Sequence, residues 1–96
     1  MNLVAVIGEV AGPVERGADG TVRFAVAVAG RDEAPDRLQV QARGAQGAAC
    51  LAYLQPGHRV AIEGRVAPEA RPAEILAERV QFLTTRAQAA ALAASA

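Results

Sequence analysis

A short helix that ends in a Pro-Gly turn, with a strand directly after it, constrains the fold of this chain most. Residues 45–54 have helical character, and Pro56-Gly57 ends that helix. Residues 59–67 then alternate, with Val60 and Ile62 on one face. A single helix before such a strand, in 96 residues otherwise rich in strand patterns, predicts a small closed β-barrel. Barrels of this kind are usually binding modules.

Four further segments have strand character. Residues 3–10 are apolar on both faces, and Gly8, Gly12 and Pro13 predict a bulged or coiled extension to residue 16. Residues 17–20 form the clearest hairpin loop, followed by a strand over 21–29. Residues 37–43 alternate most cleanly, with a wholly polar outer face. The last strand covers residues 73–83, and its phase slips at Glu78-Arg79, as at a bulge.

The length supports one domain over residues 1–83, followed by an alanine-rich tail over 84–96. So short an alanine-rich segment is marginal as a helix, and we expect a frayed or disordered tail. Only three aromatic residues are present, so the core must be built from Val, Ile and Leu. We expect Phe24 and Phe82 in that core and Tyr53 packed on the helix. The helix is expected to bury Ala48, Leu51, Ala52 and Leu54.

Three strands, a helix and two strands follow one another in this chain. This is the order of an all-β oligonucleotide/oligosaccharide-binding (OB) fold, a five-stranded Greek-key barrel with one α-helix between strands 3 and 4.

Charge and composition narrow the function. Ten arginines balance ten acidic residues, with no lysine, so any anion-binding site must be a local patch. The single cysteine, Cys50, excludes an internal disulfide and a cysteine-based metal site, and we expect it to be buried. His58 is expected at the surface. With no catalytic constellation, we expect no enzyme, no cofactor and no metal. The absence of a signal-peptide pattern or long apolar run predicts a cytoplasmic protein without a membrane segment.

Four segments resemble the bacterial single-stranded DNA-binding protein family. The matching stretches, in family order, are Asn2 to Gly8, Asp19 to Ala27, Tyr53 to Arg65 and Val80 to Leu83. They resemble that family's opening strand, its Asn-Gly-Thr turn, its Tyr-Leu-x-x-Gly-x-x-Val-x-Ile-Glu-Gly segment and its closing strand. The resemblance covers roughly residues 2–83 and implies an OB-fold that binds unpaired DNA.

The departures from the family concern the aromatic rings on which bases stack. The family's strand tryptophan falls at about Asp36 or Arg37 here, and its next aromatic corresponds to Arg43. The hairpin that often carries another tryptophan is expected to be reduced to residues 68–72, and we expect the family's acidic Pro-Phe tail to be absent. Each stacked base contributes roughly 1–3 kcal/mol, so we expect weakened or specialised binding unless Arg planes substitute.

Arg37, Gln39, Gln41 and Arg43, which share the polar face of the third strand, are the main candidates for nucleic-acid contact. The alternative is a solvated outer strand face. Further candidates on neighbouring strands are Arg23, Arg59 and Arg65, although an ion pair of Glu63 with Arg59 or Arg65 explains these equally well. The acidic cluster Asp32, Glu33 and Asp36 has no functional explanation.

Two functions remain open. The first is sequence-nonspecific binding of single-stranded DNA in replication, recombination and repair, with the protein at the nucleoid. The second is an assembly or adaptor role similar to that of the primosomal replication-restart paralogs, with little DNA affinity. In both cases we expect a homo-oligomer through residues 3–7, a tetramer being favoured and a dimer possible.

Overall fold

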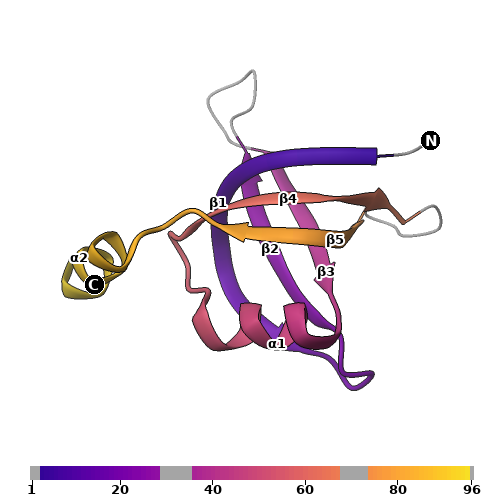
Figure 1. Ribbon diagram of the computed structural model, residues 1–96, viewed down its shortest axis with the longest axis horizontal. Coiled ribbons are helices and arrows are strands. Elements are labelled where there is room, and N and C mark those ends of the chain that lie inside the picture. Colours follow the sequence, from indigo (N-terminus) through magenta and orange to yellow (C-terminus); the bar gives the residue numbers. More distant parts are fainter. Residues whose placement is uncertain (1–2, 29–35, 68–73, 96) are drawn as a thin grey trace.

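The architecture is a small β-barrel carrying two helices (Figure 1). The structure is a computed structural model and describes residues 3–28, 36–67 and 74–95. In chain order its elements are β1 (Leu3–Arg16), β2 (Val22–Val28), β3 (Asp36–Ala42), α1 (Gly44–Tyr53), β4 (Arg59–Val66), β5 (Glu74–Phe82) and α2 (Arg86–Ser95). Of the segments discussed above, Asp32, Glu33 and residues 68–72 lie outside the described residues.

The sheet closes on itself in the order β1-β2-β3-β5-β4. All strand pairs are antiparallel except β3 with β5, which run parallel over three residue pairs. α1 follows β3 and precedes β4, and it contacts β1, β2 and β3. The five-stranded OB-fold predicted from the order of the elements is therefore confirmed.

The core consists of the inward-facing residues of the strands. Alternation places every second residue inside. On β2, Val22, Phe24 and Val26 are almost fully buried, as are Val40 on β3 and Ile62 on β4. Phe24 is the only one of the three aromatic residues in this core, so branched aliphatic side chains fill most of it. The predicted placements of Phe24 and Cys50 are confirmed.

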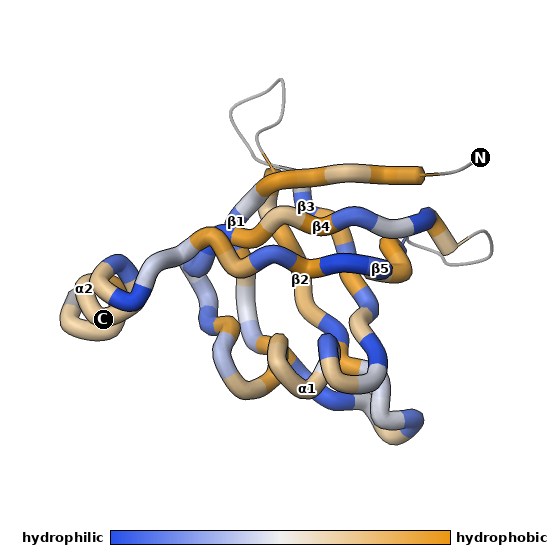
Figure 2. The backbone as a smooth tube through the Cα atoms, in the orientation of Figure 1, coloured by the Kyte–Doolittle hydropathy of each residue, from blue (hydrophilic) through white to orange (hydrophobic). Residues whose placement is uncertain are grey.

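β1 is long because it pairs with two strands in succession. Residues 3–9 pair with β4, and from Glu9 onward the strand pairs with β2. The register shifts between Ala11 and Glu15, where Gly12 has φ +91°, so the predicted bulge is confirmed. This curvature is visible in Figure 1, and Figure 2 shows the first half of β1 as an apolar segment.

A second bulge lies between β4 and β5. Glu63 pairs with Arg79 while Gly64 pairs with Ala77, which leaves Glu78 as the extra residue, as the phase slip predicted. At Gly64 the backbone of β5 comes so close that an added Cβ would overlap the carbonyl oxygen of Leu76. Glycine at this position therefore permits the close approach of the two strands.

α1 covers one end of the barrel with a face different from the predicted one. The buried positions are Gly47, Cys50 and Leu54, whereas Ala48, Leu51 and Ala52 are exposed, so only Leu54 was correctly assigned. The helix lies close to the end of β3, since a Cβ at Gly47 would come within 2.7 Å of the Ala42 carbonyl oxygen. Hydropathy alone predicts that leucine and alanine face the barrel. The close contact between α1 and the end of β3 instead requires glycine, the smallest residue, at position 47.

α1 is also tied to β5 by a side chain, because the backbone N–H of Val80 donates to Gln46 Oε1 at 2.7 Å. On the buried side of the helix, desolvation raises the pKa of the Cys50 thiol to about 11. The thiol therefore remains protonated across the neutral pH range and is a poor nucleophile in the folded protein.

The C-terminal segment differs from the frayed or disordered tail that we expected, since residues 86–95 form helix α2. Its N-terminus has a reciprocal capping box. The Thr85 N–H donates to Gln88 Oε1 at 2.9 Å, and the Gln88 N–H donates to Thr85 Oγ1 at 3.1 Å. The Thr-Arg-Ala-Gln sequence at residues 85–88 is a capping-box pattern and predicts a helix start. The expectation of a frayed tail considered only the alanine content. Leu92 of α2 lies beside Gly57 in the turn before β4.

Among the described residues, neither helix is long and apolar enough to cross a membrane.

The close approach at Gly64 predicts a large loss of stability on adding one methyl group. Gly64→Ala should lower the free energy of unfolding by about 1–3 kcal/mol, since the strands must separate to accommodate the Cβ. Glu63→Ala, an exposed change one residue away, should cost less than about 0.5 kcal/mol. Urea denaturation of both variants measures the difference. Equal stability of the two variants would contradict the close approach.

Candidate nucleic-acid interface

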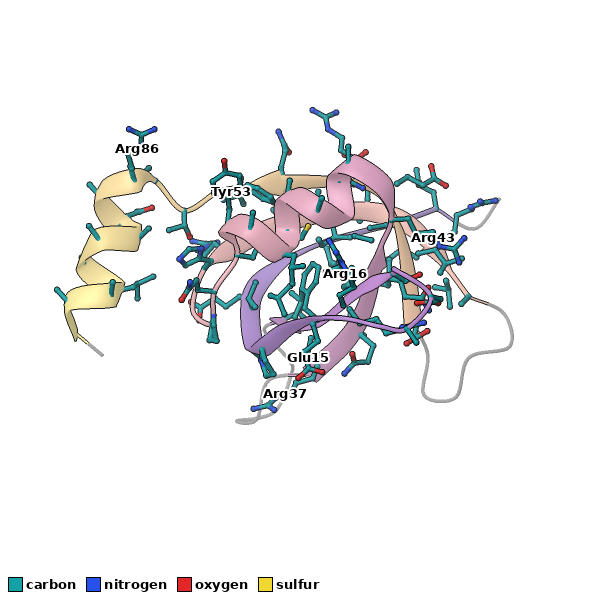
Figure 3. The ribbon with its side chains drawn as sticks, turned by 90° about the horizontal axis from the view of Figure 1, so that it is seen from below. Glu15, Arg16, Arg37, Arg43, Tyr53 and Arg86 are labelled. Carbon is teal, nitrogen blue, oxygen red and sulfur yellow. The ribbon has the colours of Figure 1, made fainter. Side chains whose placement is uncertain are left out.

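The outer face of β3 carries the main candidate residues. Arg37 and Gln39 are exposed and Gln41 is half-buried, whereas Val40 and Ala42 between them are buried. Arg43 continues the exposed series directly after the strand. The period-two pattern therefore places all four polar side chains on the outside, with the two arginines at opposite ends of β3 (Figure 3).

Two more candidates lie beside this face. The strand register places Arg23 of β2 next to Gln41 on one side. On the other side Gln41 is next to Leu76 of β5, and Leu76 is next to Arg65 of β4. Arg23, Gln41 and Arg65 thus lie in one row across four strands.

Arg23 is not free, because carboxylates lie on two sides of it. Its Nη2 is 3.4 Å from Asp19 Oδ2, and its Nε is 3.9 Å from Glu74 Oε1. The other oxygen of Glu74 accepts a short hydrogen bond from Gln41 Nε2. Glu74 therefore holds both Arg23 and Gln41, and it brings a negative charge to this end of the face.

Arg65 is also paired. Its Nε lies 2.9 Å from Glu78 Oε1, the extra residue of the β5 bulge. The sequence had suggested Glu63 as a partner for Arg65, and that expectation is wrong about the partner. Both side chains are more than half exposed, so this pair contributes little to stability.

Arg37, Arg43 and Arg59 take part in no ion pair within the part of the chain that the structure describes. Arg59 lies apart from the row around Gln41. Its register partner on β1 is Glu9, which is next to Ala27 of β2, and Ala27 is next to Arg37. The register therefore places Arg59 in one row with Arg37, whereas Arg23, Gln41 and Arg65 lie in another row nearer the α1 end of β3.

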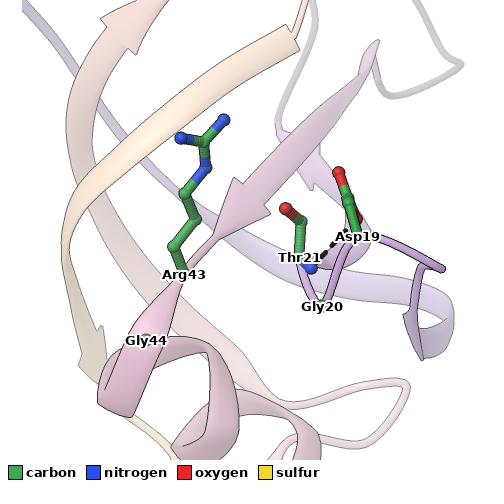
Figure 4. Close-up of a pocket in the computed structure, with 5 residues that line it drawn as sticks. All are labelled: Asp19, Gly20, Thr21, Arg43 and Gly44. Atoms are coloured by element: carbon green, nitrogen blue, oxygen red, sulfur yellow. Dashed lines mark hydrogen bonds between the residues drawn. The ribbon is translucent and has the colours of Figure 1, made fainter.

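Arg43 lines a hollow at the tip of the β1–β2 hairpin, together with Asp19, Gly20, Thr21 and Gly44 (Figure 4). The Thr21 N–H donates to Asp19 Oδ1 at 3.0 Å. That backbone hydrogen bond holds the pKa of the Asp19 carboxyl below its ordinary value, and Arg23 acts in the same direction. Asp19 is therefore charged at neutral pH, opposite Arg43 across the hollow.

Two aromatic residues lie where the sequence did not place them. Phe82 was expected in the core, but 42% of it is exposed, so that expectation is wrong. It has the inward phase of β5 and pairs with the buried Val60, yet it lies at the end of the strand, where the barrel no longer covers it. Tyr53, expected to pack on the helix, is 69% exposed and contacts Phe82. The position of a residue in the alternation of a strand shows which way its side chain points, but not whether other residues cover it.

No group of three or more His, Cys, Asp or Glu side chains suited to a metal ion occurs among the residues described. The candidate residues lie on the outer surface of an OB-fold barrel.

Comparison with solved structures confirms the resemblance at the level of the fold. A small single-stranded DNA-binding protein from Streptomyces coelicolor is 26% identical, covering 85% of this chain and 94% of that chain, with a TM-score of 0.69. The second single-stranded DNA-binding protein from Mycobacterium smegmatis is 21% identical, covering 85% and 88%, with a TM-score of 0.74. The dimeric N-terminal domain of PriB from Thermoanaerobacter tencongensis is 23% identical, covering 88% and 98%, with a TM-score of 0.67. No protein-family model and no curated protein sequence matches the chain.

The contacts of Glu74 and Glu78 predict unequal effects from two changes on the same strand. Glu74→Ala should lower the free energy of unfolding by about 1 kcal/mol or more, since it removes a half-buried hydrogen bond to a charged group. Glu78→Ala should cost less than about 0.5 kcal/mol, since its pair is exposed. Urea denaturation at pH 7 compares them, and a larger cost for Glu78→Ala would contradict this account.

Proposed function

We propose that this protein binds single-stranded DNA without sequence preference and acts in replication, recombination and repair, at the nucleoid of the cell. The observation that carries the proposal is the outward series of Arg37, Gln39, Gln41 and Arg43 on a barrel whose 26% identical structural neighbour is a single-stranded DNA-binding protein. Guanidinium groups pair with phosphates, and amide side chains hydrogen-bond base edges.

Charge explains why this binding is local and weak. The net charge is zero, so attraction to a polyanion depends on the arginines that carry no carboxylate partner. Of the candidate arginines, Arg37, Arg43 and Arg59 meet that condition within the described residues, and Arg23 and Arg65 do not. Arg37 and Arg43 also share the β3 face, so they are the main phosphate contacts in this proposal, with Gln39 between them; Arg23, Arg65 and Arg59 are secondary.

The salt dependence of binding tests these two arginines. Affinity for a fluorescent oligo-dT should fall steeply with salt, and Arg37→Ala/Arg43→Ala should reduce the slope of log K against log salt by about 1.4, or about 0.7 per lost phosphate contact. Arg79→Ala, an exposed arginine outside the β3 face, should leave the slope nearly unchanged. Absence of binding by the native protein even at low salt would exclude the proposed function.

An exposed apolar stripe supports the homo-oligomer that we expect for both functions and on which the adaptor function depends. Leu3 is 62% exposed and Ile7 57% exposed, and with Ala5 they form an apolar stripe on the outside of β1. An exposed apolar stripe on a strand favours association. We propose that the protein is a homo-oligomer through this stripe, a tetramer being favoured over a dimer; the PriB neighbour is dimeric. If the arginine variants leave DNA binding unchanged or the native protein does not bind, the adaptor function is preferred.

A charge placed in the stripe tests the assembly. Ile7→Glu should raise the dissociation constant of the oligomer by about 100-fold or more, because an unpaired charge is costly to bury in an apolar contact. Light scattering at several protein concentrations measures the mass. Arg37→Ala, on the far side of β2 from this stripe, serves as the control and should keep the native mass. A native protein that is monomeric, or an unchanged mass for Ile7→Glu, would disprove association through β1.

A further inference from the structure

Two of the three aromatic residues of the chain meet at the surface. The ring centroids of Tyr53 and Phe82 are 6.4 Å apart, and the ring planes are tilted by 56°. One ring comes from the last residue of α1 and the other from the last residue of β5. Exposed aromatic surface is costly to leave in water, so a pair of rings held together at the surface indicates a contact made there.

The rings form part of a groove with a basic rim. Tyr53, Phe82, His58, Arg59 and Arg86 line one pocket, which we call the aromatic groove. Arg86 is the first residue of α2 and lies on the same side as Tyr53 in Figure 3. Among its described lining residues there is no carboxylate. The acidic group nearest in register is Glu9, the β1 partner of Arg59, which lines the neighbouring hollow instead.

The wall of the groove is held in place by hydrogen bonds. The Arg59 N–H donates to Thr84 Oγ1 at 2.6 Å, and the Leu83 N–H donates to the Arg59 carbonyl at 2.9 Å. The capping box at Thr85 then starts α2 directly after this connection. These bonds fix Arg59 and the start of α2 beside the rings, so the groove is preorganised.

We propose that Tyr53 and Phe82 are a base-stacking platform for single-stranded DNA, with Arg59 and Arg86 contacting the adjacent phosphates; this rests on the proposed function. A planar π surface beside two permanent cations matches a ligand that carries flat rings and phosphates. A hydrophobic peptide matches the rings but not the cations. The platform lies at the other end of α1 from Arg43 (Figure 3).

The composition of the chain provides a direct probe of this contact. Tyr53 is the only tyrosine and there is no tryptophan, so the intrinsic emission of the protein comes from Tyr53 with a minor contribution from phenylalanine. A base stacked on the ring quenches that emission. Titration with unlabelled oligo-dT should reduce it with the same midpoint as the anisotropy of a labelled oligo-dT. Thymidine at matched absorbance corrects for the inner-filter effect.

The affinity of Tyr53 and Phe82 variants for oligo-dT shows whether a base stacks on these rings or whether binding changes the tyrosine emission indirectly. Tyr53→Ala should weaken oligo-dT binding about 5- to 140-fold, the equivalent of one stacked base, and Tyr53→Phe should stay within about twofold of native. Phe82→Leu keeps the apolar volume and should also weaken binding. Leu51→Ala truncates an exposed apolar side chain of α1 outside the groove and should have no effect.

The outcomes distinguish this inference from the proposed function. Oligo-dT binding with unchanged tyrosine emission, or with native affinity in Tyr53→Ala, overturns the platform and leaves single-stranded DNA binding intact. Failure of the native protein to bind at low salt overturns both. Quenching together with weaker binding by Tyr53→Ala and Phe82→Leu supports the platform.

Discussion

The barrel depends on a very short parallel contact between β3 and β5. Among the described residues three pairs form it, Gln39 with Glu74, Val40 with Ile75 and Gln41 with Leu76. Two side-chain hydrogen bonds stabilise this parallel contact, which we call the parallel seam. Gln46 of α1 accepts a hydrogen bond from the backbone of β5, and Glu74 binds Gln41 across the seam. The carboxylate that would weaken an anion-binding face is thus also part of what closes the barrel.

Because some carboxylates pair with arginines on this surface, the candidate arginines fall into two groups. Arg23 and Arg65 pair with acidic residues of the same surface, which cancels their charge; the exposed pair of Arg65 with Glu78 adds little stability. Arg37, Arg43 and Arg59 have no such partner among the described residues. A chain of zero net charge therefore offers positive potential at separate points instead of one continuous track. Arg43 precedes the first residue of α1 and the rings of Tyr53 and Phe82 meet at its last residue, whereas Arg37 lies at the far end of β3.

Much of the fold was predictable because strands have a strict period of two. The faces of β2, β3 and β4 and the bulge at Glu78 follow from alternation and its interruptions, and the hairpin at residues 17–20 follows from its Asp-Gly turn. The errors have three separate causes. The α1 face was misassigned because a close contact selected Gly47 over larger apolar residues. α2 was missed because two side-chain hydrogen bonds cap a segment judged by its alanine content. Phe82 was misplaced because it lies at the end of the barrel.

The candidate site, like the fold, was predictable from the sequence only in part. The amino-acid sequence by itself determined that Arg37, Gln39, Gln41 and Arg43 share one outer face, because side-chain direction along a strand is a local property of the backbone. Only the tertiary structure decided that Glu74 pairs with Arg23, since Glu74 lies far along the chain and reaches Arg23 and Gln41 only where β5 runs beside β3. It likewise brought Tyr53, Phe82 and Arg86 together from three elements. Proximity between distant segments depends on how the whole barrel closes.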